Sequence, residues 1–280
     1  MKQIKIPKRN GTFRIVVCPS SKEKQENRKL IPYFTQLALL LDVHKVSHGF
    51  VTTRSPVTNA KCHIGYEYSL CFDLKDFFDT VTEGLLQKLG VVYFMKKGLP
   101  KAMFESANHV CVVDKVFRQG IPTSPSICNI AFSVVDKRIM RCVNRLKKRG
   151  YKIVYTRYAD DLTFSFDDPK LIKQLRRYMP ICCKKFGFTV NHKKTHCQWA
   201  RNGRRNITGV MVDDKAIYPT KRIRRRFRAA KKNNTRKQIN GLGEWCKLKE
   251  PNWVRTVGQL FHGTQQEQLL AMTIQELHTP

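Results

Sequence analysis

The stretch that most constrains how this chain can fold is Tyr158-Ala159-Asp160-Asp161, an acidic pair between two segments that favour strands. Residues 152–157 are rich in β-branched and aromatic side chains, and residues 162–166 alternate apolar with hydroxyl side chains. A tight turn between the two would hold two adjacent carboxylates at the tip of a hairpin. Like charges so close repel, and a divalent cation would neutralise them. The alternative interpretation is that Asp-Asp is simply a favourable turn sequence.

A third carboxylate stands at the end of another strand-like segment. Residues 69–72 are mostly apolar and run directly into Asp73. If this strand neighbours the hairpin in one sheet, Asp73, Asp160 and Asp161 converge on one point. Such a trio is what two Mg²⁺ ions need for in-line phosphoryl transfer, with Mn²⁺ as the alternative metal.

The charge of the chain indicates a polyanionic partner. Fifty-three Lys and Arg residues against 21 Asp and Glu give a net charge of +32, which favours nucleic acid. An anionic membrane is the competing partner, but we find no apolar run near the length of a span and no signal peptide. The ten cysteines form no C-x-x-C pattern, which is typical of a reduced, cytosolic protein. We therefore expect a cytoplasmic protein that binds nucleic acid and no membrane.

Other patterns locate the first half of the fold. Asn10-Gly11 is a turn signal that predicts a hairpin over residues 4–17, and apolar spacing predicts a helix over 30–47. A Gly/Pro/Ser/Thr loop, residues 118–126, leads into a strongly amphipathic segment that predicts a helix over 125–149. A small-residue loop before a helix N-terminus suits a phosphate or nucleoside.

The last third of the chain changes in character. Residues 206–214 are expected to form one strand, with Gly209 at a bulge or a close approach. Residues 221–232 combine many arginines and lysines with a thin apolar stripe, which predicts a basic helix. The alternatives for this segment are a localisation patch or a disordered tail. A final helix is expected over 264–277.

Six short elements, taken in order, resemble those of reverse transcriptases and, more narrowly, of the bacterial retron type. They are Asn59-Ala60-Lys61-Cys62-His63, Asp73 with Phe77-Phe78, Gln119-Gly120-Ile121-Pro122-Thr123-Ser124-Pro125, Tyr158-Ala159-Asp160-Asp161, Asn191-His192-Lys193-Lys194-Thr195 and Ile207-Thr208-Gly209. The last has Ile where the family has Val. Each element is weak by itself, and their shared order is what makes the resemblance specific.

The resemblance implies an α+β fold of the right-hand polymerase type, in which the palm is an antiparallel sheet packed on helices. The N-terminal part of the fingers would span residues 1–68. The palm, with intervening fingers elements, would span 69–214. A small, basic, helical thumb would span 215–280.

The resemblance also assigns roles to single residues. Asp73, Asp160 and Asp161 would be both catalytic and metal-binding, and Lys194 would be the general acid, with Lys193 as its rival. The nucleotide-binding residues would be Phe78 (the gate that rejects a ribose 2′-OH), Gln119, Gly120, Tyr158 and Arg14. The nucleic-acid-binding residues would be Asn59, His63, Thr208, Gly209, Arg222, Arg225 and Arg226.

The activity implied is that of an RNA-directed DNA polymerase using dNTPs. It would copy part of a cognate structured non-coding RNA, primed from an RNA 2′-OH, into a branched RNA–DNA hybrid (msDNA). A separate effector protein in phage defence would be a further partner. The alternatives are another bacterial reverse transcriptase, of the group II intron or a non-retron defence type, and a non-catalytic RNA-binding scaffold. The Asn59–His63 and Thr208-Gly209 elements favour the retron type.

Overall fold

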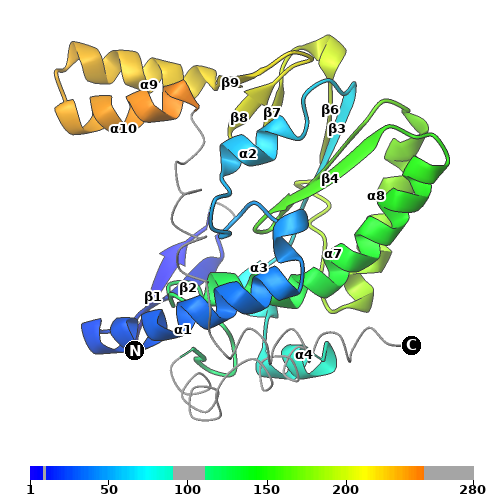
Figure 1. Ribbon diagram of the computed structural model, residues 1–280. Coiled ribbons are helices and arrows are strands. Elements are labelled where there is room, and N and C mark those ends of the chain that lie inside the picture. The colour runs from blue at the N-terminus through cyan, green and yellow to red at the C-terminus, as the bar shows by residue number, and fades with distance from the viewer. Residues whose placement is uncertain (9–10, 91–110, 249–280) are drawn as a thin grey trace, which may run out of the picture.

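The computed structural model describes residues 1–8, 11–90 and 111–248 of the chain. Its elements, in chain order, are β1 (Lys2–Pro7), β2 (Phe13–Cys18), α1 (Ser21–Leu40), η1 (Val43–Lys45), α2 (Pro56–Lys61), β3 (Tyr68–Asp73), α3 (Phe77–Thr80), α4 (Glu83–Lys88), α7 (Ser124–Lys148), β4 (Ile153–Tyr158), β5 (Asp161–Phe166), α8 (Lys170–Lys185), β6 (His196–Trp199), η2 (Ala200–Asn202), β7 (Arg205–Ile207), β8 (Val210–Val212), β9 (Ile217–Pro219), α9 (Lys221–Lys232) and α10 (Arg236–Lys247). Helices and antiparallel sheets are mixed along the chain, as an α+β fold requires (Figure 1).

The central sheet has the strand order β4-β5-β3-β6, and every neighbouring pair is antiparallel. The expected acidic hairpin is present: β4 and β5 pair from Ile153 opposite Phe166 to Tyr158 opposite Asp161. Strand β3 pairs with β5 on its other side, in a register that sets Asp73 opposite Asp161. The acidic strand ends therefore lie at the same edge of the sheet.

Helix α7 is the main support of this sheet and confirms the helix expected over 125–149. Residues 127–133 of the helix are all buried, and beyond them the buried positions recur at three or four residues, through Ile139 to Val143. It contacts α1, α8 and β4, and α1 and α7 run side by side below the strands in Figure 1. Fully burying each such aliphatic side chain stabilises the fold by about 1.5–3 kcal/mol. Gly150, with φ +85°, allows the chain to leave the helix.

The N-terminal hairpin β1–β2 is confirmed, with Lys2 opposite Cys18 and Pro7 opposite Phe13. The helix expected over 30–47 is real, but its predicted bounds were wrong, because α1 begins at Ser21 and ends at Leu40. Ser20 and Glu23 form a reciprocal capping box that fixes its start. Such a cap contributes about 1 kcal/mol, and its Ser-x-x-Glu pattern could be read in the sequence.

The single strand expected over 206–214 is wrong, because β7 and β8 form a hairpin there. Thr208 and Gly209 are its two-residue turn, and both have positive φ, +47° and +82°. Positive φ at both positions matches the turn that best joins antiparallel strands. A Cβ on Gly209 would meet nothing within 4 Å, so this glycine is not at a close approach. Strand β9 completes a three-stranded sheet, which packs on α2.

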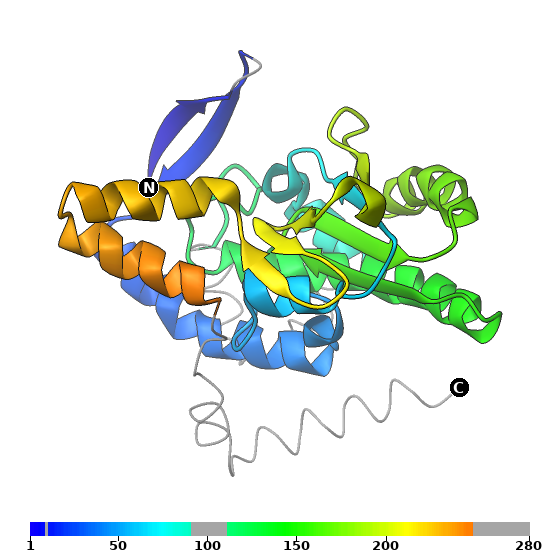
Figure 2. The same ribbon diagram turned by 90° about the horizontal axis from the view of Figure 1, so that it is seen from above.

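The basic helix expected over 221–232 is confirmed as α9, which Thr220 caps at its N-terminus. It packs against α10 as a helical hairpin beside the second sheet, at the opposite end of the molecule from α8 (Figure 2). The helix expected over 264–277 lies outside the described residues. None of the described helices has the length and apolar character needed to cross a membrane.

Candidate active site

The three acidic residues of interest meet where β3 ends beside the β4–β5 turn. Asp73 ends β3 and faces Asp161, the first residue of β5. Asp160 lies in the turn, and its carbonyl oxygen accepts a hydrogen bond of 3.0 Å from the backbone N–H of Leu74. Backbone pairing therefore makes neighbours of residues that are far apart in the sequence.

The charges of this site act strongly on one another. Partial burial, followed by the charges of Asp160 and Asp73, raises the pKa of Asp161 to about 6. Burial is also the main reason why the pKa of Asp160 is raised, and repulsion from Asp73 adds to it. Lys194 and Arg14 oppose that rise. Burial and repulsion between neighbouring carboxylates thus disfavour the ionised forms of Asp160 and Asp161.

Asp73 is held by two polar side chains from the segment after α8. Lys194 Nζ donates to its Oδ1 at 2.8 Å, and Asn191 Nδ2 donates to its Oδ2 at 3.2 Å. The hydrogen bond to Asp73 is the main reason why the pKa of Lys194 is raised. Of the two candidate lysines, Lys194 rather than Lys193 makes this ion pair. The site role of Asn191 was missed, although it opens the Asn-His-Lys-Lys-Thr element.

The donor set fits a divalent cation in its chemistry. Carboxylate oxygens are ligands that Mg²⁺ prefers, and a cation would relieve the repulsion that adds to the effect of burial on the pKa values of Asp160 and Asp161. Within the described residues, however, no three His, Cys, Asp or Glu side chains already converge on one metal position. Both oxygens of Asp73 are engaged by Lys194 and Asn191. An incoming cation would compete with the Lys194 ammonium for Asp73.

The loop before α7 docks on the N-terminal hairpin. The Gln119 carbonyl oxygen accepts a hydrogen bond of 2.8 Å from the Val17 N–H. Gly120 has φ +104°, and a Cβ there would clash with the Val17 carbonyl oxygen. Glycine is therefore required at this position by both conformation and space. Arg14 lies on the same hairpin, is exposed, and is close enough to lower the pKa of Asp160.

Two aromatic residues flank the acidic edge. Phe78 is half-buried and meets Phe77 and Phe50 edge to face, with ring centroids 5.7 and 6.1 Å away. Tyr158 immediately precedes the acidic turn and is half-buried, and burial raises the pKa of its hydroxyl. The nucleotide-binding roles of Phe78, Gln119, Gly120, Tyr158 and Arg14 remain predictions.

A family model described as reverse transcriptase (RNA-dependent DNA polymerase) matches residues 6–243. This chain belongs to the reverse transcriptase family. The family resemblance read from the six sequence elements is thereby confirmed.

The relatives are named as retron reverse transcriptases. The chain is 34% identical over 268 residues to retron Mx65 reverse transcriptase of Myxococcus xanthus, a match that covers 88% of this chain and 60% of that protein. It is 32% identical over 286 residues to retron Mx162 reverse transcriptase of the same organism, covering 88% and 57%. With retron Ec86 reverse transcriptase of Escherichia coli it shares 32% over 171 residues, covering 61% and 50%. The chain thus spans about three-fifths or less of the length of these relatives.

Solved structures support the fold. Telomerase from Candida albicans, in complex with a fragment of telomeric RNA, aligns with a TM-score of 0.58 at 16% identity, covering 78% of this chain and 46% of the other. Apo telomerase from Candida tropicalis, truncated from its C-terminal domain, gives 0.54 at 16%, covering 78% and 54%. At this identity the likeness shows a shared fold, and it confirms the expected α+β polymerase architecture.

Two residues that were expected to contact nucleic acid are buried inside the protein. Asn59 and His63 are fully buried, so the prediction of direct contact is wrong. The His63 ring lies between two hydroxyls, with Nδ1 at 2.8 Å from Ser165 Oγ and Nε2 at 2.7 Å from Thr156 Oγ1. Burial is the main cause that lowers the pKa of His63 to about 3. His63 thus joins the turn after α2 to β4 and β5 of the central sheet.

The Asn59 and Thr208 elements of the reverse transcriptase resemblance turn out to be one structural unit. Asn59 Nδ2 donates to Thr208 Oγ1 at 3.2 Å, which ties α2 to the turn between β7 and β8. Gly209, at the tip of that turn, is exposed. Arg222, Arg225 and Arg226 are exposed on α9. Nucleic-acid contact by Thr208, Gly209 and these arginines stays a prediction.

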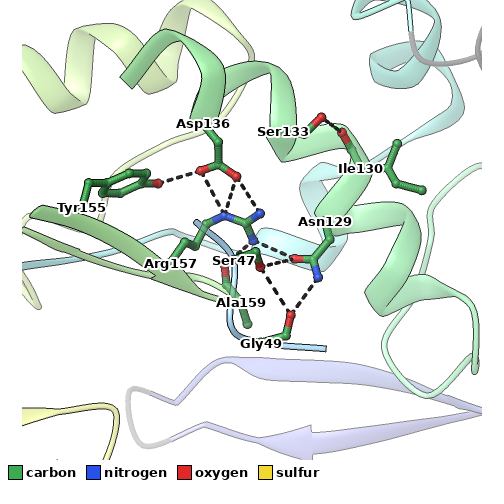
Figure 3. Close-up of polar contacts among 9 residues, drawn as sticks. All are labelled: Ser47, Gly49, Asn129, Ile130, Ser133, Asp136, Tyr155, Arg157 and Ala159. Atoms are coloured by element: carbon green, nitrogen blue, oxygen red, sulfur yellow. Dashed lines mark hydrogen bonds and ion pairs between the residues drawn. The ribbon is translucent and has the colours of Figure 1, made fainter. Parts of the chain in front are cut away.

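A buried polar network beneath the acidic turn was not predicted from the sequence. Arg157, next to Tyr158, is fully buried and pairs with Asp136 of α7 (Figure 3). A charged residue at an inward-facing position of an apolar strand is the signal that could have found it, since such a charge needs a partner inside the protein.

Proposed function

We propose that this chain is an RNA-directed DNA polymerase that copies part of a structured RNA into DNA by two-metal phosphoryl transfer. The observation that carries the proposal is the meeting of Asp73, Asp160 and Asp161 at one sheet edge, beside Lys194, in a member of the reverse transcriptase family. Phosphoryl transfer of this kind needs positioned carboxylates and charge stabilisation more than covalent chemistry by the protein.

We assign separate roles in metal binding, proton donation and triphosphate contact to individual residues. Asp73, Asp160 and Asp161 would bind two Mg²⁺ ions, which supply activation of the primer hydroxyl and charge neutralisation at the triphosphate. Lys194, protonated at Asp73, would donate a proton to the pyrophosphate leaving group. Arg14 would meet the triphosphate from the hairpin β1–β2.

The remaining candidates would shape the nucleotide pocket. Gln119 and Gly120 would line it from the loop that docks on β2. Phe78 would exclude a ribose 2′-OH by its bulk, and its ring is already constrained by Phe77 and Phe50. Tyr158 would pack near the primer end.

We propose the corresponding domain division. Residues 1–68 would belong to the fingers, and 69–214 would form the palm with intervening fingers elements. Residues 215–280 would form the thumb, whose described part contains β9 and the basic hairpin α9–α10. The exposed arginines of α9 support this placement, because phosphate contacts dominate affinity for nucleic acid.

The names of the relatives as retron reverse transcriptases support a finer proposal about template, priming and partner. We propose a cognate non-coding RNA as template, priming from an RNA 2′-OH, a branched RNA–DNA product, and a separate effector protein in phage defence. The bacterial cytoplasm is the proposed location, and ten free cysteines support it.

Two experiments test the proposal. The first is purification with the native locus, followed by extraction of bound nucleic acid. The second is extension of a DNA primer on an RNA template with dNTPs. The Asp160→Asn/Asp161→Asn variant is the control in both. A branched RNA–DNA species in the wild type alone supports the retron activity. Primer extension without that species supports a reverse transcriptase of another type. RNA binding equal in both proteins, without DNA synthesis in either assay, would overturn the enzyme and favour an RNA-binding scaffold.

A further inference from the structure

Arg157 is the centre of a buried network directly below the acidic turn (Figure 3). Its Nε donates to Asp136 Oδ1 and Oδ2 at 3.2 and 3.1 Å, and its Nη2 donates to Oδ2 at 2.8 Å. Asp136 also accepts a hydrogen bond of 2.7 Å from the Tyr155 hydroxyl. The carboxylate on α7 thus fixes the plane of the guanidinium group.

The free end of the guanidinium reaches the turn itself. Arg157 Nη1 donates to the Ala159 carbonyl oxygen at 3.2 Å and to Asn129 Oδ1 at 2.7 Å. Ala159 has φ +54°, which is unfavourable for a residue with a Cβ. A buried donor on its carbonyl group stabilises this conformation. The peptide that Arg157 holds is the one that leads into Asp160.

The same network holds residues 47–50 against the turn. Asn129 Nδ2 donates to the Gly49 carbonyl oxygen at 2.8 Å, and Ser47 Oγ donates to the same oxygen at 3.4 Å. A Cβ on Gly49 would lie 2.5 Å from the Ala159 backbone nitrogen. The chain therefore passes in direct contact with the turn.

A buried ion pair by itself says little about function, because apolar residues of similar volume often stabilise a core as well. This network differs because two of its acceptors are backbone carbonyl groups, at Ala159 and Gly49, on the two segments that meet at the acidic turn. Apolar side chains in place of Arg157 and Asn129 would remove the Arg157 donor from the Ala159 carbonyl group and leave the Gly49 carbonyl group with only the longer bond from Ser47.

We propose that Arg157, oriented by Asp136 and Asn129, is a positioning residue that sets the placement of the Asp160–Asp161 carboxylates for metal binding. This inference rests on the proposed polymerase function. Arginine is required because a planar fork with five N–H donors can serve Asp136, Asn129 and Ala159 together. A lysine ammonium, with three donors at one point, cannot span them.

The test is Arg157→Lys, with Arg205→Lys as the matched control. Arg205 is also buried and also bridges elements, since Nη1 donates to Ser69 Oγ and Nη2 to the His63 carbonyl oxygen, but it makes no contact with the turn. Mn²⁺ affinity is measured by electron paramagnetic resonance on the full chain without nucleotide. Primer extension then gives the half-saturating Mg²⁺ concentration and kcat per active site, with the active fraction counted by titration.

For Arg157→Lys we expect Mn²⁺ affinity and kcat to fall about 10–100-fold, the range seen when residues that orient metal ligands are changed. The half-saturating Mg²⁺ concentration should rise by a similar factor. Arg205→Lys should lose thermal stability without a change in metal affinity. Equal metal affinity in wild type and Arg157→Lys, with a loss of stability alone, overturns the inference.

A second pair of variants covers the case in which Arg157→Lys does not fold. Asn129→Ala keeps every bond between Arg157 and Asp136 and removes the bonds of Asn129 to Arg157 Nη1 and to the Gly49 carbonyl oxygen. Ser133→Ala, one turn further along α7, removes a buried hydroxyl that bonds only to the Ile130 carbonyl oxygen of its own helix, at 2.7 Å (Figure 3). Metal affinity should fall at least threefold in the first variant and stay unchanged in the second. Equal effects of the two would overturn the inference.

The metal-binding readout separates this inference from the proposed function. A wild type that binds Mn²⁺ but makes no DNA would refute the polymerase and leave the positioning role of Arg157 measurable. A wild type that makes DNA, with Arg157→Lys unchanged in metal affinity, would refute the positioning role alone.

Discussion

Two polar clusters of this molecule, both carrying elements of the reverse transcriptase resemblance, are built on opposite principles. At the edge of the central sheet, Asp160 and Asp161 reach solvent and repel each other. Beneath the second sheet, Asn59 and His63 are fully buried, and the His63 ring is hydrogen-bonded on both sides. The first cluster leaves charge uncompensated, which a ligand can use, while the second satisfies its polar groups largely within the protein. A family element in a sequence can therefore mark either a site or a joint of the fold.

The largest expected effect is the loss of kcat when a carboxylate of the acidic edge is changed. Asp160→Asn should lower kcat about 10³-fold, or about 4 kcal/mol in the barrier, because one charged metal ligand is lost. Thermal stability without metal should not fall, since the change removes repulsion. Scanning calorimetry and primer extension measure the two quantities.

Asp76→Asn is the matched control for that prediction. Asp76 is exposed, pairs with Lys8 at 2.8 Å, and has φ +44°, a conformation that Asn tolerates well. A surface pair of this kind contributes at most about 1 kcal/mol, and kcat should stay within about twofold of wild type. If Asp76→Asn lost as much activity as Asp160→Asn, the loss in Asp160→Asn could not be assigned to a metal ligand at the acidic edge.

The second prediction concerns the buried cluster. His63→Ala should destabilise the fold by about 2–4 kcal/mol, because it leaves a cavity and two hydroxyls without their partner. The folded protein should bind RNA as tightly as wild type at low temperature. Urea denaturation and filter binding measure these properties. Normal stability with RNA affinity reduced more than tenfold would return His63 to the nucleic-acid surface and break the comparison.

Features of the acidic edge could be predicted from the sequence more fully than those of the buried cluster. The acidic hairpin and the strand before Asp73 were predictable because their patterns are local. The partners of His63, Thr156 and Ser165, lie about a hundred residues away, so its burial left no local mark. A two-residue turn at Thr208 was hidden because threonine rarely takes positive φ. Lys193 and Lys194 belong to one basic turn, so the sequence alone could not show which of them pairs with Asp73. The structure shows that Lys194 does.

A third prediction uses pH to test the burial of His63. Its pKa is lowered from the ordinary 6.5 to about 3, so the folded protein holds it neutral while the unfolded chain takes up a proton below pH 6.5. The stability due to neutral His63 is therefore complete above pH 6.5 and is lost as the pH falls toward 3. The expected slope is about 1.4 kcal/mol per pH unit for this residue.

His63→Phe is the comparison for the pH measurement, because it keeps an aromatic ring and cannot titrate. Denaturation of both proteins between pH 7 and 5 should show a shallower slope for the variant. His48 is buried too, with a pKa lowered to about 4, so both proteins should retain part of the acid sensitivity. Identical slopes would mean that His63 is protonated in the folded protein, which its burial and the nearby charge of Arg205 disfavour.

The smallest expected effect is on RNA binding, when one of the exposed arginines of α9 is changed. These arginines lie on the surface, in contrast to the buried Asn59 and His63. Arg225→Gln should weaken RNA binding about two- to fivefold and reduce the slope of log K against log salt by about 1, because one phosphate contact is lost. Lys173→Gln, which changes another exposed cation, on α8 at the far end of the molecule, should leave that slope unchanged. Equal slopes for the two variants would mean that positive charge acts through the whole surface. A difference confined to Arg225 would place the RNA beside the second sheet, where Asn59 and His63 then serve as the rigid base of the binding surface.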